Sequence, residues 1–157
     1  MTTADYIQSI GLFITITGLT ITVFYNCKQL KIFNEQLKLN FFADYTKRYQ
    51  EIILNFPESI NQKNFDIRKM PENDRNEVLK YMRVYFNLCS EEYDLYTNNY
   101  ISERVWKNWK EGIEFAFSKK AFVDAWYIIK LDTTYYSKFT ILINDILKGG
   151  KDKKQLL

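Results

Sequence analysis

The chain of 157 residues contains no histidine, and it has only two cysteines, two prolines and five glycines. The lack of histidine removes the commonest general base, the usual zinc and iron ligand and the side chain that most often titrates near neutral pH. The sequence also contains no glycine-rich phosphate loop, no nucleophile elbow and no metal-ligand spacing. We therefore predict no catalytic residue, no metal site and no cofactor, and we expect that the protein is not an enzyme.

Aromatic residues are plentiful, with 12 tyrosines, 12 phenylalanines and three tryptophans. Glycine and proline interrupt helices, so their scarcity indicates long helices joined by short loops. The composition predicts an all-α fold with a core rich in aromatic rings. The expected order is an N-terminal transmembrane helix that continues into a stalk helix, and then an irregular soluble bundle of about five helices.

An uncharged and mostly apolar stretch extends from Tyr6 to Tyr25. A helix of about twenty apolar residues crosses the hydrocarbon core of a bilayer, which is roughly 30 Å thick. Apolar residues partly alternate with threonine over residues 13–23, so a half-buried strand is an alternative, as are a buried core helix and an interfacial helix. The length of the run favours a single membrane span, and no second alternating segment could pair with a strand.

The flanks of this run predict its orientation. No basic residue precedes it, whereas Lys28, Lys31 and Lys38 follow it closely. The positive-inside rule places the N-terminus outside and the rest of the chain in the cytoplasm. The acidic N-terminus and the lack of a small-residue cleavage pattern argue against a cleaved secretory signal.

One face of the predicted span carries small and hydrogen-bonding side chains. At about 100° per residue they fall within roughly a quarter of the helix circumference. They are Gln8, Gly11, Thr15, Gly18, Thr22 and Asn26. Such a face lets membrane helices approach closely, which predicts an oligomer interface with a second copy or another membrane protein. Glycine and threonine are also common in membrane helices that make no such contact.

The organisation after the span follows from stop and cap signals. We expect the N-terminus and transmembrane helix at residues 1–27, a helical stalk at 28–40, a cytoplasmic helical bundle at 41–148 and a disordered basic tail at 149–157. The first helix should end at Phe56, before Pro57. The further helices should begin at Asn73 or Asp74, at Ser102, at Ser118 and at Thr133 or Thr134, and Gly149-Gly150 should end the last one.

Two segments are candidate contact sites. The polar connection 58–74 is expected to be a surface loop or a site for a cytoplasmic protein partner. Segment 148–154 has four lysines and one aspartate, so its net charge of +3 equals that of the whole chain. This segment is expected to be solvated or to touch anionic lipid. No basic groove with interleaved aromatic residues is present, so no nucleic acid partner is expected.

Glu92 is the one charged residue that falls on the apolar stripe of its helix. A carboxyl group there is either desolvated, with a raised pKa, or paired with a cation such as Arg83 or Arg104. The functional interpretation is an acid that handles protons or binds a ligand, and the structural one is a buried ion pair. The same two interpretations apply, with weaker support, to Asp124, which lies between Val123 and Ala125.

The two cysteines are not expected to form a disulfide in a cytoplasmic domain. Cys27, at the membrane edge, is either an inert small residue or a lipidation site. Cys89 lies on an apolar stripe and is expected in the core.

The span, the basic stalk and residues 86–126 together resemble a family of small bacterial single-span membrane proteins with a helical cytoplasmic domain. The family is described only as a domain of unknown function. The matching residues are Glu91, Glu92, Tyr93, Leu95, Tyr96, Ile101, Trp106, Trp109 and Trp126, and Asn98-Asn99 stands where glycine is frequent. The resemblance implies the fold and membrane anchoring, here to the inner membrane, but no activity.

Two functions are carried forward from the sequence. The first is a membrane-anchored, non-enzymatic interaction or sensing module of a bacterium, with the lipid bilayer and a second copy as partners. The alternative is a membrane-perturbing effector of a toxin or phage-defence system, in which the polar face of the span lines an oligomeric defect. An enzyme that uses Glu92 is a third and weaker hypothesis.

Overall fold

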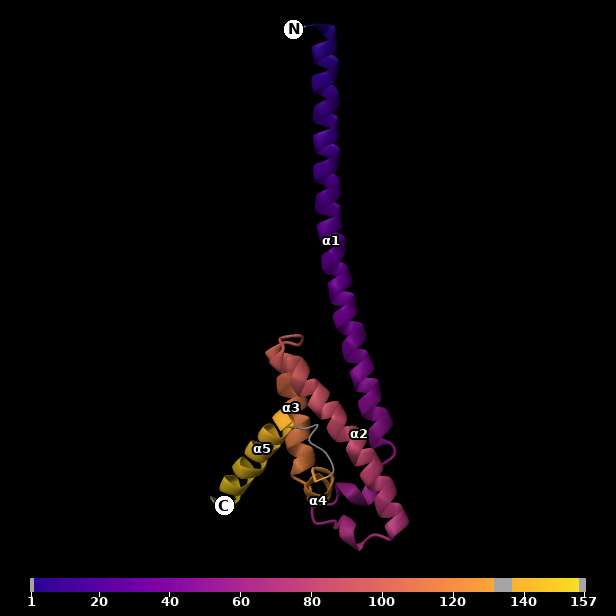
Figure 1. The fold of residues 1–157 in the computed structure, drawn as a ribbon, viewed down its shortest axis with the longest axis vertical. Helices are drawn as coiled ribbons and strands as arrows, with labels where there is room; N and C mark the ends of the chain where they lie inside the picture. Colours follow the sequence, from indigo (N-terminus) through magenta and orange to yellow (C-terminus); the bar gives the residue numbers. More distant parts are fainter. Residues whose placement is uncertain (1, 132–136, 156–157) are drawn as a thin grey trace. The chain divides into compact units, whose positions relative to one another are not determined.

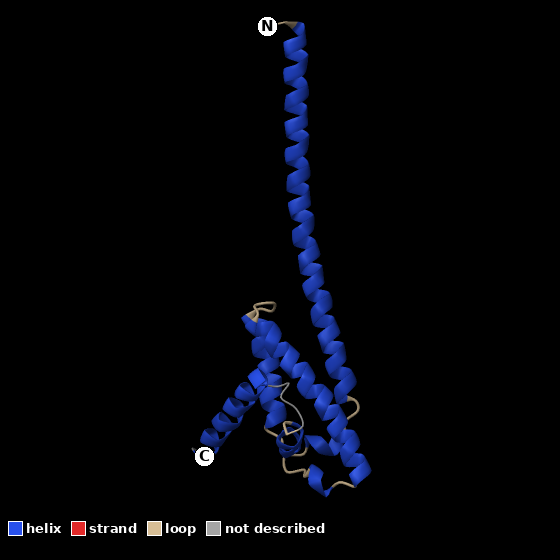
Figure 2. Ribbon diagram, in the orientation of Figure 1, coloured by secondary structure: helices blue, strands red, loops and turns tan. Residues whose placement is uncertain are grey.

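The computed structural model describes residues 2–131 and 137–155, and these residues form helices and turns without a strand. The elements are α1 (Thr3–Ile53), the 3₁₀ helices η1 (Glu58–Asn61) and η2 (Ile67–Lys69), α2 (Glu72–Thr97), α3 (Glu103–Phe117), α4 (Lys120–Ile129) and α5 (Ser137–Gln155) (Figures 1 and 2). The predicted all-α fold, with a long N-terminal apolar helix followed by a helical bundle, is therefore confirmed. The chain divides into two compact units, Met1–Lys47 and Arg48–Leu157, which are described separately.

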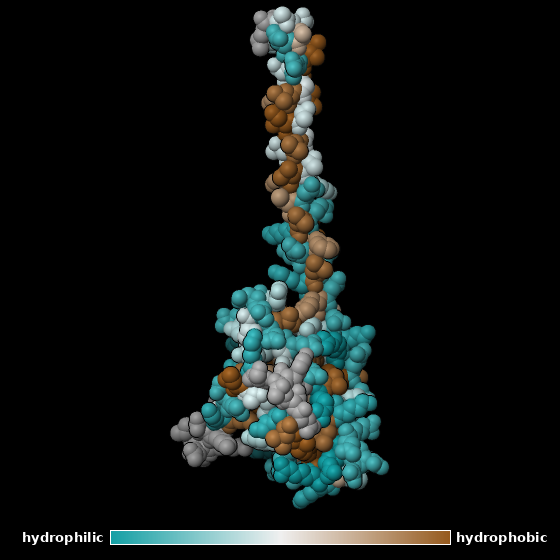
Figure 3. Space-filling view, viewed as in Figure 1, coloured by the Kyte–Doolittle hydropathy of each residue, from teal (hydrophilic) through white to brown (hydrophobic). Residues whose placement is uncertain are grey.

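The first unit consists of α1 up to Lys47. It contains one stretch that is long and apolar enough to cross a membrane, and no part of that stretch is buried within the protein. Apolar side chains, in brown, alternate with paler residues along this part of α1 (Figure 3), and Phe13 and Phe24 are each more than 70% exposed. Length and composition agree with the predicted span, although a signal sequence would meet the same two criteria.

The threonines of the apolar stretch bond within the helix. The hydroxyls of Thr15, Thr17, Thr20 and Thr22 each donate to the carbonyl oxygen four residues earlier, at 2.8–2.9 Å. A hydroxyl that is satisfied in this way adds little polarity to the helix surface. Residues 13–23, in which threonine alternates with apolar residues, therefore form part of a helix and not the strand considered as an alternative.

The second unit, which we call the bundle (Arg48–Leu157), is organised around α2. Because its inward residues recur every three or four positions, α2 presents one face to its neighbours. Val78, Met82, Phe86 and Cys89 on α2 are all buried, and α2 packs against both α3 and α4.

Aromatic rings fill the centre of the bundle. Phe86 of α2 packs edge-on against Trp126 of α4 with ring centroids 5.3 Å apart, and Trp126 packs edge-on against Phe139 of α5 at 5.7 Å. Phe117 of α3 stacks on Phe86 at 5.5 Å. Such pairs contribute beyond the area they bury, and they join four helices through one cluster, which fits the predicted aromatic core.

The turn between α2 and α3 agrees with the cap predicted from the sequence. Ser102 is the N-cap of α3, and its hydroxyl oxygen accepts a hydrogen bond from the Val105 N–H at 3.4 Å. Asn99 has a φ of 61°, the left-handed region that asparagine tolerates better than most residues. An asparagine can therefore occupy this turn without glycine.

The predicted starts of two helices were wrong, by two or three residues for α2 and by one residue for α4. The N-cap of α2 is Pro71, so Asn73 and Asp74 lie inside the first turn, where Asp74 faces the positive end of the helix dipole. The N-cap of α4 is Lys119, and the hydroxyl of Ser118 instead donates to the Phe115 carbonyl at the end of α3. A serine hydroxyl can accept a bond from a backbone N–H or donate one to a backbone carbonyl, so the residue type alone did not decide its role.

The ends of α1 and α5 also differ from the predictions. α1 ends at Ile53, three residues before Phe56, and α5 continues to Gln155, beyond the predicted stop at Gly149-Gly150. The glycines of the described residues have no positive φ. Glycine disfavours a helix by only about 1 kcal/mol, and the following lysines are good helix formers that suit a helix C-terminus. Thr133 and Thr134, the predicted start of the last helix, lie outside the described residues.

Candidate functional site

Glu92 lies on the inward face of α2 and is only 7% exposed. It follows Tyr85 and Cys89 at spacings of four and three residues, so the three side chains share one face of the helix. The pKa of Glu92 is raised to about 8, mainly by burial; the charge of Arg48 opposes this rise, and the neighbouring Glu91 carboxylate adds to it. The predicted buried acid is therefore present, and it is largely protonated at neutral pH.

Arg48 is the cation that acts on Glu92, in place of Arg83 or Arg104, the two cations named from the sequence. Its Nη1 lies 2.9 Å from Oε2 of Glu91, so its guanidinium already forms a partly exposed ion pair with the adjacent carboxylate. Arg48 belongs to the last turns of α1, and 43 residues separate it from Glu91 in the chain. Helical periodicity carries no information about such a contact, which is why the sequence did not predict it.

Three further ionisable groups face this position. Burial raises the pKa of Tyr49, from α1, and raises the pKa values of Tyr85 and Cys89 well above their ordinary ranges, with Glu92 adding to each shift. The Cys89 thiol lies beside the Tyr85 hydroxyl and is 2% exposed. The thiol is therefore protonated and inert at neutral pH, as expected for a core cysteine.

The ionisable groups of this cluster are held in their neutral forms. A nucleophile needs an adjacent base with a suitable pKa, whereas here burial keeps the thiol, the phenols and the Glu92 carboxyl protonated together. In the described part of the chain, no three acidic or cysteine side chains are arranged to hold a metal ion. The arrangement can store one proton inside the bundle and can change the charge there as the pH rises.

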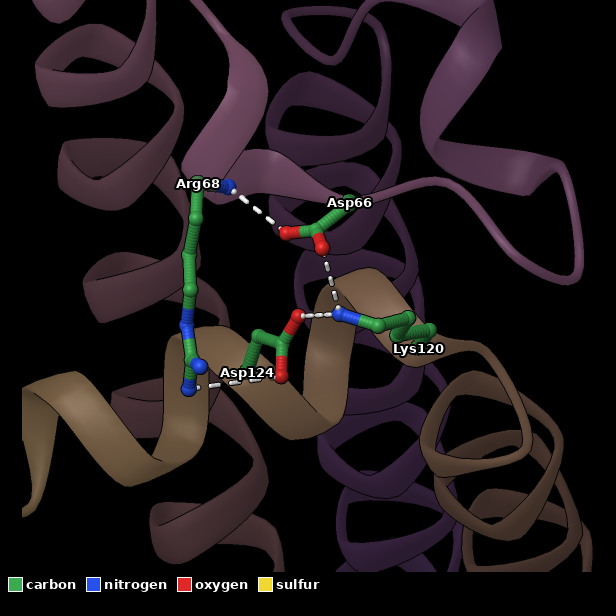
Figure 4. Close-up of polar contacts among 4 residues, drawn as sticks. All are labelled: Asp66, Arg68, Lys120 and Asp124. Atoms are coloured by element: carbon green, nitrogen blue, oxygen red, sulfur yellow. Dashed lines mark hydrogen bonds and ion pairs between the residues drawn. The ribbon is translucent and has the colours of Figure 1, made fainter.

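A second cluster joins the connection after α1 to α4 (Figure 4). The ammonium group of Lys120 lies between two carboxylates: it pairs with Asp124 and lies 3.1 Å from Oδ2 of Asp66. Arg68 Nη2 lies 3.6 Å from the other oxygen of Asp124, and the Arg68 N–H donates to Asp66. The bond from Lys120 lowers the pKa of Asp66, and the two carboxylates raise the pKa of Lys120. Asp124 is thus a buried member of an ion-pair network.

This network explains how a long connection is ordered. Ile60 of η1 and Ile67 of η2 are almost completely buried, and the Lys120 N–H donates to the Lys63 carbonyl at 3.3 Å. Apolar anchors and ion pairs therefore hold the segment that the sequence predicted as a polar surface loop or partner site. Buried isoleucines in a polar segment were the signal that could have indicated this anchoring.

The six small or hydrogen-bonding residues of the predicted membrane face all lie on α1. They are Gln8, Gly11, Thr15, Gly18, Thr22 and Asn26, and all are exposed. No side chain from elsewhere lies within 4 Å of a Cβ built on Gly11 or Gly18. The face is therefore open along its length, and the predicted oligomer interface stays a prediction.

Comparison of the chain with protein-family models, with curated proteins and with solved structures finds no match. The resemblance to a family of single-span membrane proteins therefore stays a prediction from the residues. Function is inferred below from the composition of α1 and from the contacts inside the bundle.

Proposed function

We propose that the protein is a membrane-anchored, non-enzymatic helical module that binds a partner or senses a state of the cell. The observation that carries this proposal is the apolar stretch of α1, which is long enough to cross a bilayer and has no buried residue. Large exposed apolar side chains are unfavourable in water, and a helix of this length and composition is accommodated by lipid.

The proposed location is a bacterial inner membrane, with the N-terminus outside and the bundle in the cytoplasm. Lys28, Lys31 and Lys38 support this orientation, since basic residues next to a span remain on the cytoplasmic side. The internal hydrogen bonds of the threonine hydroxyls support insertion, because a hydroxyl that is already bonded costs less to place in lipid.

The bundle is proposed as the partner-binding or sensing part. Its interior is an aromatic core with one protonated acid, an arrangement suited to a stable scaffold rather than to catalysis. Its surface carries large exposed apolar residues, including Tyr100 at 73% and Phe115 at 66% exposure, which are side chains that protein interfaces use. A cytoplasmic protein, and a second copy or another membrane protein beside the span, are the proposed partners.

Membrane fractionation tests the proposed anchor. The full chain should remain in the pellet after alkaline extraction and dissolve only in detergent. Replacing both Ile16 and Leu19 by arginine should release it, because each arginine at the centre of a span costs about 2.5–3.5 kcal/mol on insertion scales.

Ile141→Arg provides the control, since Ile141 is exposed on the bundle and this variant should stay in the pellet. A wild-type chain found in the soluble fraction without detergent would refute the anchor and the orientation together.

The alternative function, a membrane-perturbing effector, is distinguished by the membrane potential. If the chain is an interaction module, its expression should leave the signal of a potential-sensitive dye unchanged. If expression of the wild-type chain causes rapid depolarisation, and the Thr15→Leu, Thr22→Leu double variant does not, the proposed interaction module would be refuted. The protein would then be an effector whose span lines a membrane defect. The double variant keeps the span apolar, so it tests the polar face without removing the anchor.

A further inference from the structure

The part of α1 that follows the apolar stretch has a second exposed apolar face. Leu30, Phe33 and Leu37 are 61%, 55% and 49% exposed, and their spacing of three and four residues places them on one side of the helix. We infer that this side, called the stalk face, pairs in parallel with the stalk face of a second copy of the chain. The inference rests on the proposed anchoring, because the membrane would insert both copies in the same direction.

The distribution of charge along the stalk favours a second copy of the chain as the partner of the stalk face. At about 100° per residue, the charged side chains of the stalk lie on the side of α1 opposite the stalk face. They are Lys28, Lys31, Glu35 and Lys38. The residues that border the stalk face are the uncharged amides Gln29, Asn34 and Gln36. Two parallel copies that meet through this face therefore bring no like charges together.

The opposite side of the stalk serves as an internal comparison. Ile32 and Leu39 are also exposed, at 41% and 69%, so exposed apolar area alone does not choose between the two sides. Lys28, Lys31, Glu35 and Lys38 stand on the same side, and parallel pairing through that side would bring each of these charges next to the same charge of the second copy. Electrostatic repulsion therefore favours the stalk face as the surface for a second copy.

The stalk face continues the helical phase of the membrane face. Phe33 follows Thr22 and Gly11 at intervals of 11 residues, and Leu37 follows Asn26 and Thr15 at the same interval. Eleven residues make three turns of 3.67 residues, so residues at this interval stay on one side of a helix. Since α1 is continuous from Thr3 to Ile53, both faces form one seam along it.

The size of the stalk face indicates that pairing depends on the anchor. Three apolar side chains per copy bury far less than the roughly 1,600 Å² of a typical stable interface. Confinement of both copies to one membrane supplies the high local concentration that a small interface needs. The pair is therefore expected in membranes.

Oxidative cross-linking of the full chain in isolated membranes tests the inference. In a Cys27→Ser background, Phe33→Cys and Leu37→Cys each place a thiol on the stalk face, whereas Lys31→Cys and Glu35→Cys place it on the charged side. With copper phenanthroline, the first two variants should run mainly as disulfide-linked dimers and the last two mainly as monomers. The Cys27→Ser chain itself retains only the buried Cys89 and should give no dimer.

The outcomes separate this inference from the proposed function. Equal cross-linking on both sides, or none on either side, in chains that sediment with the membranes would overturn the stalk pairing and leave the anchor intact. Chains absent from the membrane pellet would overturn the anchor, and the pairing with it. Circular dichroism of each cysteine variant should show unchanged helix content, because all four positions are exposed.

Discussion

Phe86→Ala is expected to lower the free energy of unfolding of the bundle by about 3–5 kcal/mol, the usual cost of truncating a fully buried phenylalanine. Phe86 has no exposed surface and contacts the rings of Tyr85, Phe117 and Trp126. Removing its ring leaves a cavity that three helices line, and rigid helices collapse into such a cavity only in part. A domain of this size is stable by roughly 5–15 kcal/mol, so the loss is a large share of the total.

Phe115→Ala is the matched control, because Phe115 is 66% exposed on α3, where the ammonium group of Lys119 lies 4.4 Å from the centre of its ring. It should cost less than about 1 kcal/mol. Urea unfolding of the full chain in mild detergent can be followed by tryptophan fluorescence, since all three tryptophans belong to the bundle. Equal losses in the two variants would show that the aromatic cluster does not form the core.

Glu92→Gln is expected to remove a dependence of stability on pH. The pKa of Glu92 is about 8 in the folded chain and about 4.5 when the side chain is free in water. The folded state therefore keeps a proton that the unfolded state has lost, and stability falls as the pH rises from 4.5 to 8. The loss is on the order of 3–5 kcal/mol at pH 8 and stays constant above it. Glutamine has nearly the same shape as glutamate but has no titrating carboxyl group.

The wild-type chain should accordingly lose stability between pH 5 and pH 8, while the Glu92→Gln variant loses much less. The groups that face Glu92 are Arg48 and Tyr49 from α1 and Tyr85, Cys89 and Glu91 from α2, and burial keeps the phenols and the thiol protonated over this range. Glu114→Gln, at a partly exposed ion pair with Lys110, should keep the wild-type slope. Parallel curves for the wild type and Glu92→Gln would assign the pH dependence to other groups.

Sequence patterns correctly predicted the features that depend on interactions between residues close together in the chain. Ser102 caps α3 because its hydroxyl bonds to a backbone N–H three residues away, and that interaction needs no other part of the chain. The placement of Glu92 inside the bundle was predictable in the same way, since periodicity places it on the stripe of Cys89. The ends of α1 and α5 were less predictable, because the signals around Pro57 and Gly149 compete with helix propensity over only a few residues.

By itself the sequence determined the helical class of this protein, the apolar stretch from Tyr6 to Tyr25 and the presence of a buried acid on α2. These features depend on composition and on spacings within single helices. Only the tertiary structure decided that Arg48 stands beside Glu91 and Glu92 and that Lys120 joins Asp66 to Asp124. Each of these contacts joins segments far apart in the chain, and the packing of helices against one another decides which distant side chains meet.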